Sequence, residues 1–254
     1  MDPCRKDGKK KMRNMDYYGE YAYEINADLG ISILRYNGSE ESVTIPESIN
    51  GLPVTGIRKH AFTGTDIVGV VVPEGVEVID DEAFAMCEFL QCVTLPATLQ
   101  TLGCGVFMGS EEISQIEFPN GNAQYYMEDG MLFSRAGRTL VFCPPGLKKE
   151  AVYIPVGTEI IGAYAFYSNR HLQHVKLPLT IKKIESGAFL FTDSMQMIEF
   201  PPYIEEIARD SFLVGTGAFA EKQFVIYAFP GSAGYWFAME QHLPVHLMYA
   251  IVTD

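Results

Sequence analysis

Two pairs of histidines have spacings that bear on metal binding. His171 and His174 form an H-x-x-H pair, and His242 and His246 lie four residues apart. A zinc site needs three or four ligands that converge from well-placed elements. No carboxylate stands at ligand spacing beside the first pair, and Pro244 keeps the second pair from sharing one helix face. We therefore predict no metal site and no cofactor.

Cysteines and glycines also gather in one part of the chain. Cys87, Cys92 and Cys104 fall close together, but none forms the Cys-x-x-Cys pattern of a metal or redox site. The glycine-rich run 103–109 lacks the Lys-Ser/Thr pair of a phosphate-binding loop. The total of five cysteines is odd and leaves at least one thiol unpaired, so we expect reduced thiols rather than a disulfide framework.

Ser232 is the remaining candidate nucleophile. In Gly231-Ser232-Ala233-Gly234, Pro230 takes the place of the first glycine of a nucleophile elbow. We interpret Ser232 as the N-cap of a short helix over 233–242, whose Trp236 belongs to a packed end cap. Because no nucleophile stands beside a base and no acids are paired, the sequence predicts a protein that is not an enzyme.

The chain around these candidates is organised by an internal repeat. An apolar residue followed by proline recurs at a spacing of 23 residues wherever no insertion intervenes, at Pro46, Pro73, Pro96, Pro119, Pro155, Pro178 and Pro201. Eleven residues after most of these prolines comes a phenylalanine, at Phe84, Phe107, Phe166, Phe189 and Phe212, with Phe62 in that place after a five-residue insertion. A unit this short cannot close a core alone, so the repeats must stack.

Each repeat predicts one half-buried strand and a return segment. Counting from proline as position 0, apolar residues at −3 and −1 alternate with variable residues at −4 and −2, which is the pattern of a strand with one buried face. Proline ends the strand because it has no amide hydrogen. Apolar residues at +3, +6, +10 and +11 predict a second short extended segment on the opposite wall. The fold class is therefore mainly β, a solenoid of about seven turns.

The segments that break the 23-residue repeat define the predicted boundaries along the chain. Residues 1–16 form a basic tail that we expect to be disordered, and 17–42 form an N-terminal cap whose hairpin pairs 21–26 with 31–36. Residues 43–212 hold the repeats, and 213–254 form a C-terminal cap with one short helix. Within the repeats, 120–154 replace the expected +6 and phenylalanine positions and predict a hairpin that enlarges one repeat. We expect it to fill space, with a protruding recognition element as the alternative.

Charge excludes two classes of partner. The net charge is −13, whereas nucleic acid and anionic membrane surfaces require a basic footprint. No run of 18 apolar residues predicts a membrane span, and no apolar run of signal-peptide length follows the basic start. By sequence we therefore expect a cytoplasmic protein without membrane insertion.

The repeat units resemble a known family. VVVPEGVEVIDDEAFAMCEFLQCVTLP and VYIPVGTEIIGAYAFYSNRHLQHVKLP are similar to BspA-like leucine-rich repeats, and the resemblance covers residues 43–212. It implies a leucine-rich-repeat solenoid, a bacterial or protist source, and a surface or secreted protein. Some members bind host matrix proteins or other cells. Proline occupies the corner where ordinary leucine-rich repeats carry an asparagine ladder.

The outward residues of the strands are the candidate binding positions, because the concave wall of a solenoid is its extended surface. Position −2 gives Thr44, Val71, Thr94, Glu117, Tyr153, Lys176 and Glu199. Position −4 gives Ser42, Gly69, Cys92, Gln115, Ala151, His174 and Met197. This mixed surface predicts a monomer that binds a protein partner, with Tyr153, His174 and Met197 as anchors. Adhesion or recognition is the first hypothesis, and an intracellular scaffold or assembly subunit is the second.

Overall fold

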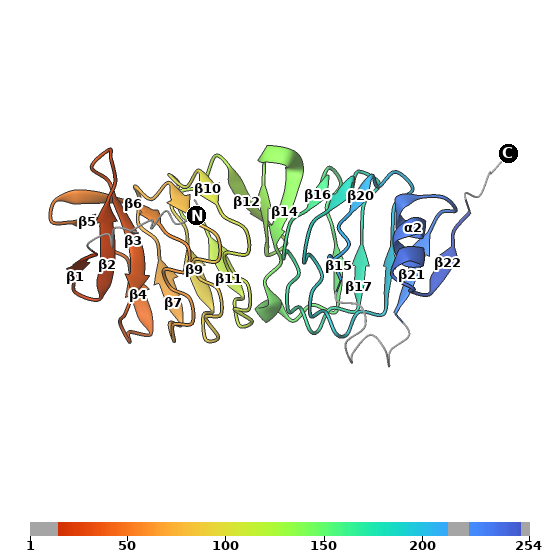
Figure 1. Cartoon of the computed structure of the whole chain (residues 1–254), viewed down its shortest axis with the longest axis horizontal. Helices are drawn as coiled ribbons and strands as arrows, with labels where there is room; N and C mark the ends of the chain where they lie inside the picture. The colour runs from red at the N-terminus through yellow and green to blue at the C-terminus, as the bar shows by residue number, and fades with distance from the viewer. Residues whose placement is uncertain (1–14, 213–223, 250–254) are drawn as a thin grey trace, which may run out of the picture.

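The computed structural model describes residues 15–212 and 224–249, and it forms an elongated solenoid (Figure 1). One long wall, called the strand wall here, is built of short parallel strands that follow one another at each turn. Its first sheet contains β4 (Ser42–Thr44), β7 (Gly69–Val71), β9 (Cys92–Thr94) and β11 (Gln115–Glu117). Its second sheet contains β15 (Ala151–Tyr153), β17 (His174–Lys176), β19 (Met197–Glu199), β21 (Val225–Ala228) and β22 (Val245–Leu247).

These four and five strands make about nine turns in the described part of the chain, so the prediction of seven turns was low. The two additional strands, β21 and β22, lie in the region predicted as a C-terminal cap. β21 pairs in parallel with β19, and β22 pairs in parallel with β21, so the ladder continues past the last recognisable proline repeat. The ladder can continue because Ile226 keeps the buried −3 position next to Ile198.

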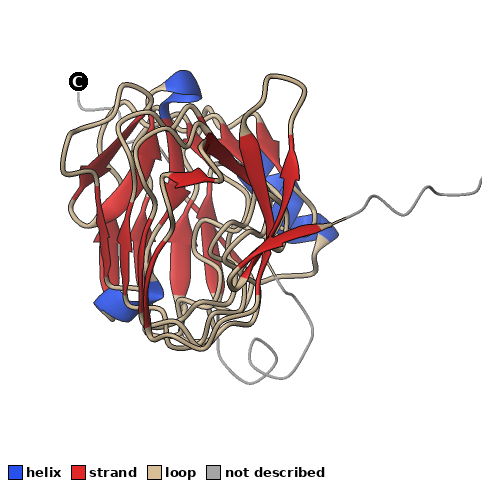
Figure 2. Cartoon of the chain, turned by 90° about the vertical axis from the view of Figure 1, so that its left-hand side faces the viewer, coloured by secondary structure: helices blue, strands red, loops and turns tan. Residues whose placement is uncertain are grey.

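The return segments form the opposite wall, as predicted, and Figure 2 shows the two walls of strands in cross-section. The strands of the first half are β6 (Leu52–Ile57), β8 (Val78–Ile79) and β10 (Thr101–Leu102). Those of the second half are β14 (Thr139–Phe142), β16 (Ile160–Ile161), β18 (Lys183–Ile184) and β20 (Glu206–Ile207). A two-residue strand suffices because each one adds to a ladder that already exists.

Stacked aromatic rings run through the core at position +11. Tyr36, Phe62, Phe84 and Phe107 follow one another with ring centroids 4.8 to 6.0 Å apart. A second run joins Phe166, Phe189, Phe212 and Phe224 at 4.7 to 5.7 Å. All of these side chains are buried. The phenylalanine positions predicted from the 23-residue period are therefore confirmed as one column of the core.

Small polar residues at position +14 form a second column beneath the aromatic one. Thr65 Oγ1 and Thr192 Oγ1 each donate to the carbonyl of the phenylalanine three residues earlier, at 2.8 and 2.9 Å. Ser110 Oγ donates to the Phe84 carbonyl at 2.8 Å, and Asn169 Nδ2 donates to the Cys143 carbonyl at 2.8 Å. In the same column Cys87 Sγ lies 3.1 Å from the Phe62 carbonyl. This column satisfies buried carbonyls, as the asparagine ladder does in ordinary leucine-rich repeats.

The N-terminal cap contains the predicted hairpin, β2 (Tyr21–Ile25) and β3 (Ile31–Tyr36), paired antiparallel about a turn in which Leu29 has φ 67°. β3 then pairs in parallel with β6 and starts the second wall. A further strand, β1 (Asp16–Tyr18), pairs with β2, so the predicted tail ends before residue 16. Residues 1–14 of that tail lie outside the described residues. A short hairpin of β5 (Ser48–Ile49) with β6 accommodates the insertion in the first repeat.

The enlarged repeat is a three-stranded meander. β12 (Tyr125–Glu128) and β13 (Met131–Ser134) form the predicted hairpin, and β14 returns antiparallel to β13 after the 3-10 turn η1 (Ala136–Arg138). Contrary to our expectation, the core columns persist here. Leu140 aligns with Ile161 at position +6, and the Phe142 ring lies 5.3 Å from that of Phe107. A second 3-10 turn, η2 (Pro145–Leu147), leads back to the strand wall.

The helix α2 (Ala233–Glu240) covers the end of the core and begins at Ser232, as predicted. The Ser232 hydroxyl accepts the Tyr235 N–H at 3.3 Å, which is the N-cap interaction. Phe237 and Ala238 are buried against the core. The helix therefore packs against the core as expected. Trp236, which we expected to pack with it, instead has 58% of its surface exposed.

Candidate protein-binding surfaces

The strand wall presents the predicted residues in two straight rows. In every repeat strand the central residue, at −3, is buried, and positions −4 and −2 face outward. Register places Gln115 beside Cys92 and His174 beside both Ala151 and Met197 in the −4 row. Of the ten preferred positions, Thr94 and Met197 are half-buried and the other eight are exposed, namely Thr44, Val71, Gln115, Glu117, Tyr153, His174, Lys176 and Glu199.

The enlarged repeat divides this wall into two sheets, which sequence spacing alone did not predict. In the first sheet the side chains are tied to one another, since Glu117 accepts from Thr94 Oγ1 at 3.2 Å and from Gln115 Nε2 at 3.3 Å. In the second sheet Tyr153 stands beside Lys176 with 70% of its surface exposed. The outward side chains of the first sheet therefore hydrogen-bond to one another, whereas the second sheet exposes a large aromatic side chain to solvent.

The second sheet has an apolar rim that sequence reasoning missed. Val156 and Leu179, each directly after a repeat proline, have 87% and 70% of their surface exposed. Tyr203, two residues after Pro201, has 74% exposed. Together with Tyr153, these residues define what we call the apolar rim. The signal was present in the sequence, because position +1 changes character between the two halves of the chain.

The first half shows what the fold accepts at position +1. Glu47, Glu74, Ala97 and Asn120 stand there, and the three polar residues are exposed whereas Ala97 is half-buried. Glu74 accepts hydrogen bonds from the Ala97 and Thr98 amides, and the Asn120 side chain donates to it at 2.9 Å. These hydrogen bonds hold the pKa of the Glu74 carboxyl below its usual value, and the bond from Asn120 has the largest effect, followed by those from the backbone amides. Apolar residues at +1 are therefore not a requirement of the solenoid.

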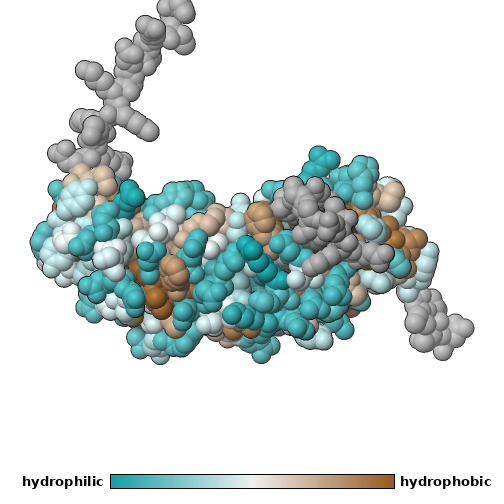
Figure 3. Space-filling model, turned by 90° about the horizontal axis from the view of Figure 1, so that it is seen from below, coloured by the Kyte–Doolittle hydropathy of each residue, from teal (hydrophilic) through white to brown (hydrophobic). Residues whose placement is uncertain are grey.

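The −2 row also extends beyond the predicted residues. Tyr227 of β21 aligns with Glu199, and His246 of β22 aligns with Tyr227, with ring centroids 5.2 Å apart. The alternation in Phe-Val-Ile-Tyr-Ala-Phe was the available signal for Tyr227. Seen from below, the molecule is mostly hydrophilic with small, separate hydrophobic patches, so a single large apolar face does not dominate that side (Figure 3).

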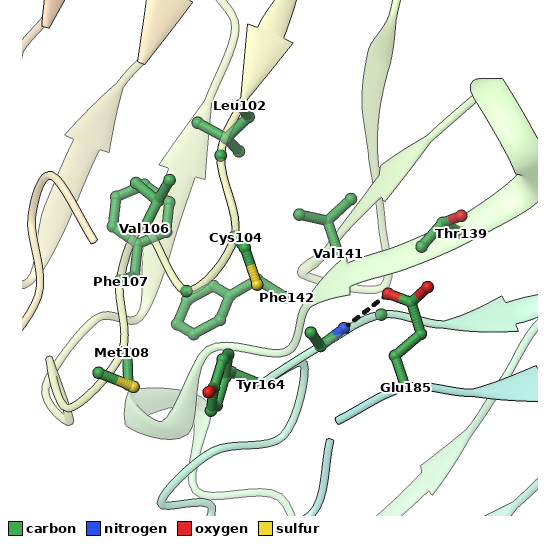
Figure 4. Close-up of a pocket in the computed structure, with 14 residues that line it drawn as sticks. Leu102, Cys104, Val106, Phe107, Met108, Thr139, Val141, Phe142, Tyr164 and Glu185 are labelled. Atoms are coloured by element: carbon green, nitrogen blue, oxygen red, sulfur yellow. Dashed lines mark hydrogen bonds between the residues drawn. The ribbon is translucent and has the colours of Figure 1, made fainter. Parts of the chain in front are cut away.

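A cleft lies where the enlarged repeat interrupts the second wall (Figure 4). Among the described residues no β-ladder joins β10 to β12 or β14, and the Tyr125 hydroxyl instead accepts the Leu102 N–H at 2.8 Å. The cavity measures about 230 Å³. Phe107 and Phe142 contribute to its lining, and Cys104, Tyr164 and Glu185 come from three different turns.

The earlier chemical candidates remain apart in the structure. His171 lies in a loop and His174 on the strand wall, both exposed. No group of three His, Cys, Asp or Glu residues suited to a metal ion occurs in the parts of the chain that the structure describes. Cys87 and Cys143 are buried free thiols, and Cys92 and Cys104 are exposed ones. No described helix is long and apolar enough to cross a membrane.

Family models and solved structures agree with this architecture. A model described as the BspA type leucine rich repeat region matches six copies over residues 55–130 and 145–217, which is more than half of the chain. The chain belongs to this BspA type leucine rich repeat family. Membership makes it a repeat scaffold of a kind that typically mediates protein–protein interaction. A comparison with curated proteins gives no match.

Several solved bacterial structures resemble this BspA type chain. A leucine-rich repeat protein from Eubacterium ventriosum is 13% identical, covers 85% of this chain and 72% of its own, and gives a TM-score of 0.54. A leucine rich cell surface protein from Faecalibacterium prausnitzii is 17% identical over 93% and 95%, with a TM-score of 0.45. The pneumococcal vaccine antigen PcpA is 13% identical over 93% and 99%, with a TM-score of 0.46. The likeness to the Eubacterium ventriosum protein shows the solenoid fold.

Proposed function

We propose that this protein is a non-catalytic scaffold that recognises another protein through the second sheet of the strand wall and the apolar rim. The observation that carries the proposal is the change at position +1 from Glu47, Glu74, Ala97 and Asn120 in the first half to Val156 and Leu179, which have 87% and 70% of their surface exposed. Equivalent turns show that folding does not need these side chains. Exposed apolar groups next to a polar sheet are typical of interaction sites.

The dimensions and chemistry of this surface suit a protein ligand. Neighbouring strands are about 4.8 Å apart, so nine strands extend on the order of 40 Å. The strand wall mixes both signs of charge with neutral groups, as Lys176, Glu199 and His174 illustrate. Recognition there depends on buried area and on aromatic anchors such as Tyr153 more than on long-range attraction.

Substitutions in the rim test the surface. Val156→Glu together with Leu179→Glu should abolish capture of the partner from matrix extracts or lysates, while the melting temperature stays within a few degrees of wild type. Ala97→Glu makes the same change at position +1 of the first half and should leave capture intact. Triple substitution of Tyr153, Lys176 and Glu199 extends the test to the strands. Unchanged capture by both sets of variants would exclude this surface.

Resemblance to the family supports a surface or secreted setting for this recognition. We propose adhesion or recognition at the bacterial surface. The second candidate, an intracellular scaffold, is favoured by the exposed free thiols of Cys92 and Cys104, because unpaired cysteines are typical of reducing compartments. Protease treatment of intact and lysed cells separates the two. Cleavage on intact cells supports surface recognition, and protection until lysis supports the intracellular scaffold.

A further inference from the structure

The cleft at the enlarged repeat has the size of one side chain. Its volume of about 230 Å³ is below the range of roughly 300–1,000 Å³ that small-molecule sites occupy. Pockets that receive a single anchor residue are a recurrent feature of protein interfaces. The cleft is also formed by the second wall, across the core from the strand wall. It therefore offers a site separate from the surface proposed above.

The interior of the cleft is apolar. Val106 and Phe107 from the turn after β10 are buried, and Met108 beside them is half-buried. Val141 and Phe142 of β14 contribute lining from the facing side (Figure 4). Such an interior matches the aliphatic part of a long side chain.

The edge of the cleft is acidic. Glu185 borders it with about a third of its side chain exposed, and its Oε2 accepts the Ala163 N–H at 3.2 Å. Lys183 is the cation beside this carboxylate, at 3.6 Å from Oε1. From the other half of the molecule, the Asp81 carboxylate accepts the Cys104 N–H at 2.8 Å. Glu185 therefore lines the cleft itself, and Asp81 lies outside the lining, bonded to Cys104.

Burial and the nearby carboxylates both disfavour the charged form of the Cys104 thiol. Partial burial, and then the charges of Asp81, Glu185 and Glu82, raise the pKa of Cys104 above its usual value. Lys59 opposes these charges and forms an ion pair with Glu82 at 3.0 Å, so Asp81 and Glu185, the two largest charge effects at this thiol, supply the negative potential. A cation is therefore the favoured occupant.

Tyr164 provides an aromatic wall, and its neighbours are adapted to it. It has φ 58° at position +9, a position that takes positive φ on other turns too, with His60 at 63° and Glu82 at 55°, and the turns on either side of Tyr164 carry Gly105 and Gly187 at φ 59° and 65°. A non-glycine residue is disfavoured in this left-handed conformation. A Cβ added to Gly187 would lie 2.4 Å from the Tyr164 ring, and one added to Gly105 would lie 3.3 Å from it. The glycines on the turns before and after Tyr164 thus leave room for its ring. The backbone conformation at Tyr164 is one that disfavours any side chain.

We propose that this cleft binds one arginine or lysine side chain of a partner protein. The aliphatic stem lies against Phe107 and Phe142, and the cationic group lies between the Tyr164 ring and the Glu185 carboxylate. Arginine fits this combination especially well, because its guanidinium both stacks on aromatic rings and pairs with carboxylates. The site is independent of the strand wall, and rim variants should leave it unchanged.

Protection of Cys104 from alkylation tests this site directly. N-acetyl-arginine amide is added to the full-length protein, iodoacetamide modifies the thiols, and peptide mass spectrometry reads each cysteine separately. We expect the rate at Cys104 to halve when the probe concentration equals its Kd, which for a single side chain lies on the order of millimolar. Cys92, exposed on the strand wall, should react at an unchanged rate and serves as the internal control.

Matched probes and variants decide the interpretation. N-acetyl-citrulline amide has the same shape without the charge and should not protect Cys104. Glu185→Gln should abolish protection by the arginine probe, whereas Glu205→Gln, which neutralises an exposed carboxylate outside the cleft, should retain it. Tyr164→Gly preserves the backbone conformation and should weaken protection. Equal protection by citrulline, or no protection by arginine, would overturn the proposal.

Discussion

Replacing Phe189 by alanine tests the stacked core at its tightest point. The ring is fully buried and lies between Phe166 at 5.0 Å and Phe212 at 4.7 Å, with interplanar angles of 7° and 10°. Truncating a buried phenylalanine costs about 3–5 kcal/mol. Each aromatic pair is worth roughly 0.5–1.5 kcal/mol beyond buried area, and because both pairs are lost the cost should fall in the upper half of that range. We therefore expect a loss of about 4–5 kcal/mol for Phe189→Ala.

Two comparisons calibrate that value. Phe107→Ala should cost about 3–4 kcal/mol, because one of its ring contacts is longer, at 6.0 Å, and the residue already borders the cleft. Glu117→Ala should cost less than about 0.5 kcal/mol, because this side chain is exposed and makes only surface hydrogen bonds. The order of the three variants follows from the burial and the ring contacts of each side chain.

Urea denaturation followed by circular dichroism measures these differences. At an m value of about 3 kcal/mol per M, a loss of about 4.5 kcal/mol lowers the midpoint by roughly 1.5 M. Trp236 fluorescence reports separately on the C-terminal core, which contains Phe189. Solenoid turns contact only their neighbours, so the two readouts need not coincide. Equal midpoints for Phe189→Ala and Glu117→Ala would refute the assignment of the column.

Three further perturbations examine individual features. Ser232→Ala removes the helix N-cap and should cost about 1 kcal/mol, seen as an earlier Trp236 transition in urea; an unchanged transition would contradict the capping role. Gly64→Ala should cost about 1–2 kcal/mol in the same assay, because φ is +69° and an added Cβ meets no neighbour, so backbone conformation alone is tested. Burial first, and then Tyr36 and Glu40, raise the pKa of Tyr21 from 10.0 to about 12, so the folded state favours the neutral phenol. Its contribution to stability is complete below pH 10 and is lost as pH rises toward 12, and Tyr21→Phe should lack this loss in alkaline denaturation.

The repeat period made most of the core predictable. Once position −3 and position +11 were recognised as columns, Val93 and Phe84 could be assigned to the interior without knowledge of any partner. Stacking then fixes the neighbours, because residues one period apart occupy equivalent places on successive turns. The N-terminal hairpin and the cap at Ser232 followed from local turn and capping chemistry. These features depend on short-range patterns, which a single sequence displays.

Features that depend on long-range register were not predictable in the same way. Leu140 and Phe142 fill core columns, but the meander before them removes the 23-residue spacing that identifies such positions elsewhere. β22 joins the strand wall although no proline repeat marks it. The cleft also escaped prediction, since its lining comes from turns that the insertion separates in sequence. Gly105 and Gly187 indicate the cleft only once it is known that both lie against the Tyr164 ring.

The structure suggests how one repeat architecture can carry two recognition sites. A regular solenoid offers the same positions on every turn, so a site arises where the residue type departs from its column. At position +1 the departure is from Glu74 to Val156 and Leu179. At position +9, where other turns carry His60, Glu82 and two glycines at positive φ, the departure is to the aromatic ring of Tyr164. The first departure places apolar groups in water, and the second adopts a disfavoured backbone conformation. Neither side chain is required by the fold on the neighbouring turns, which is why we propose a binding role for both.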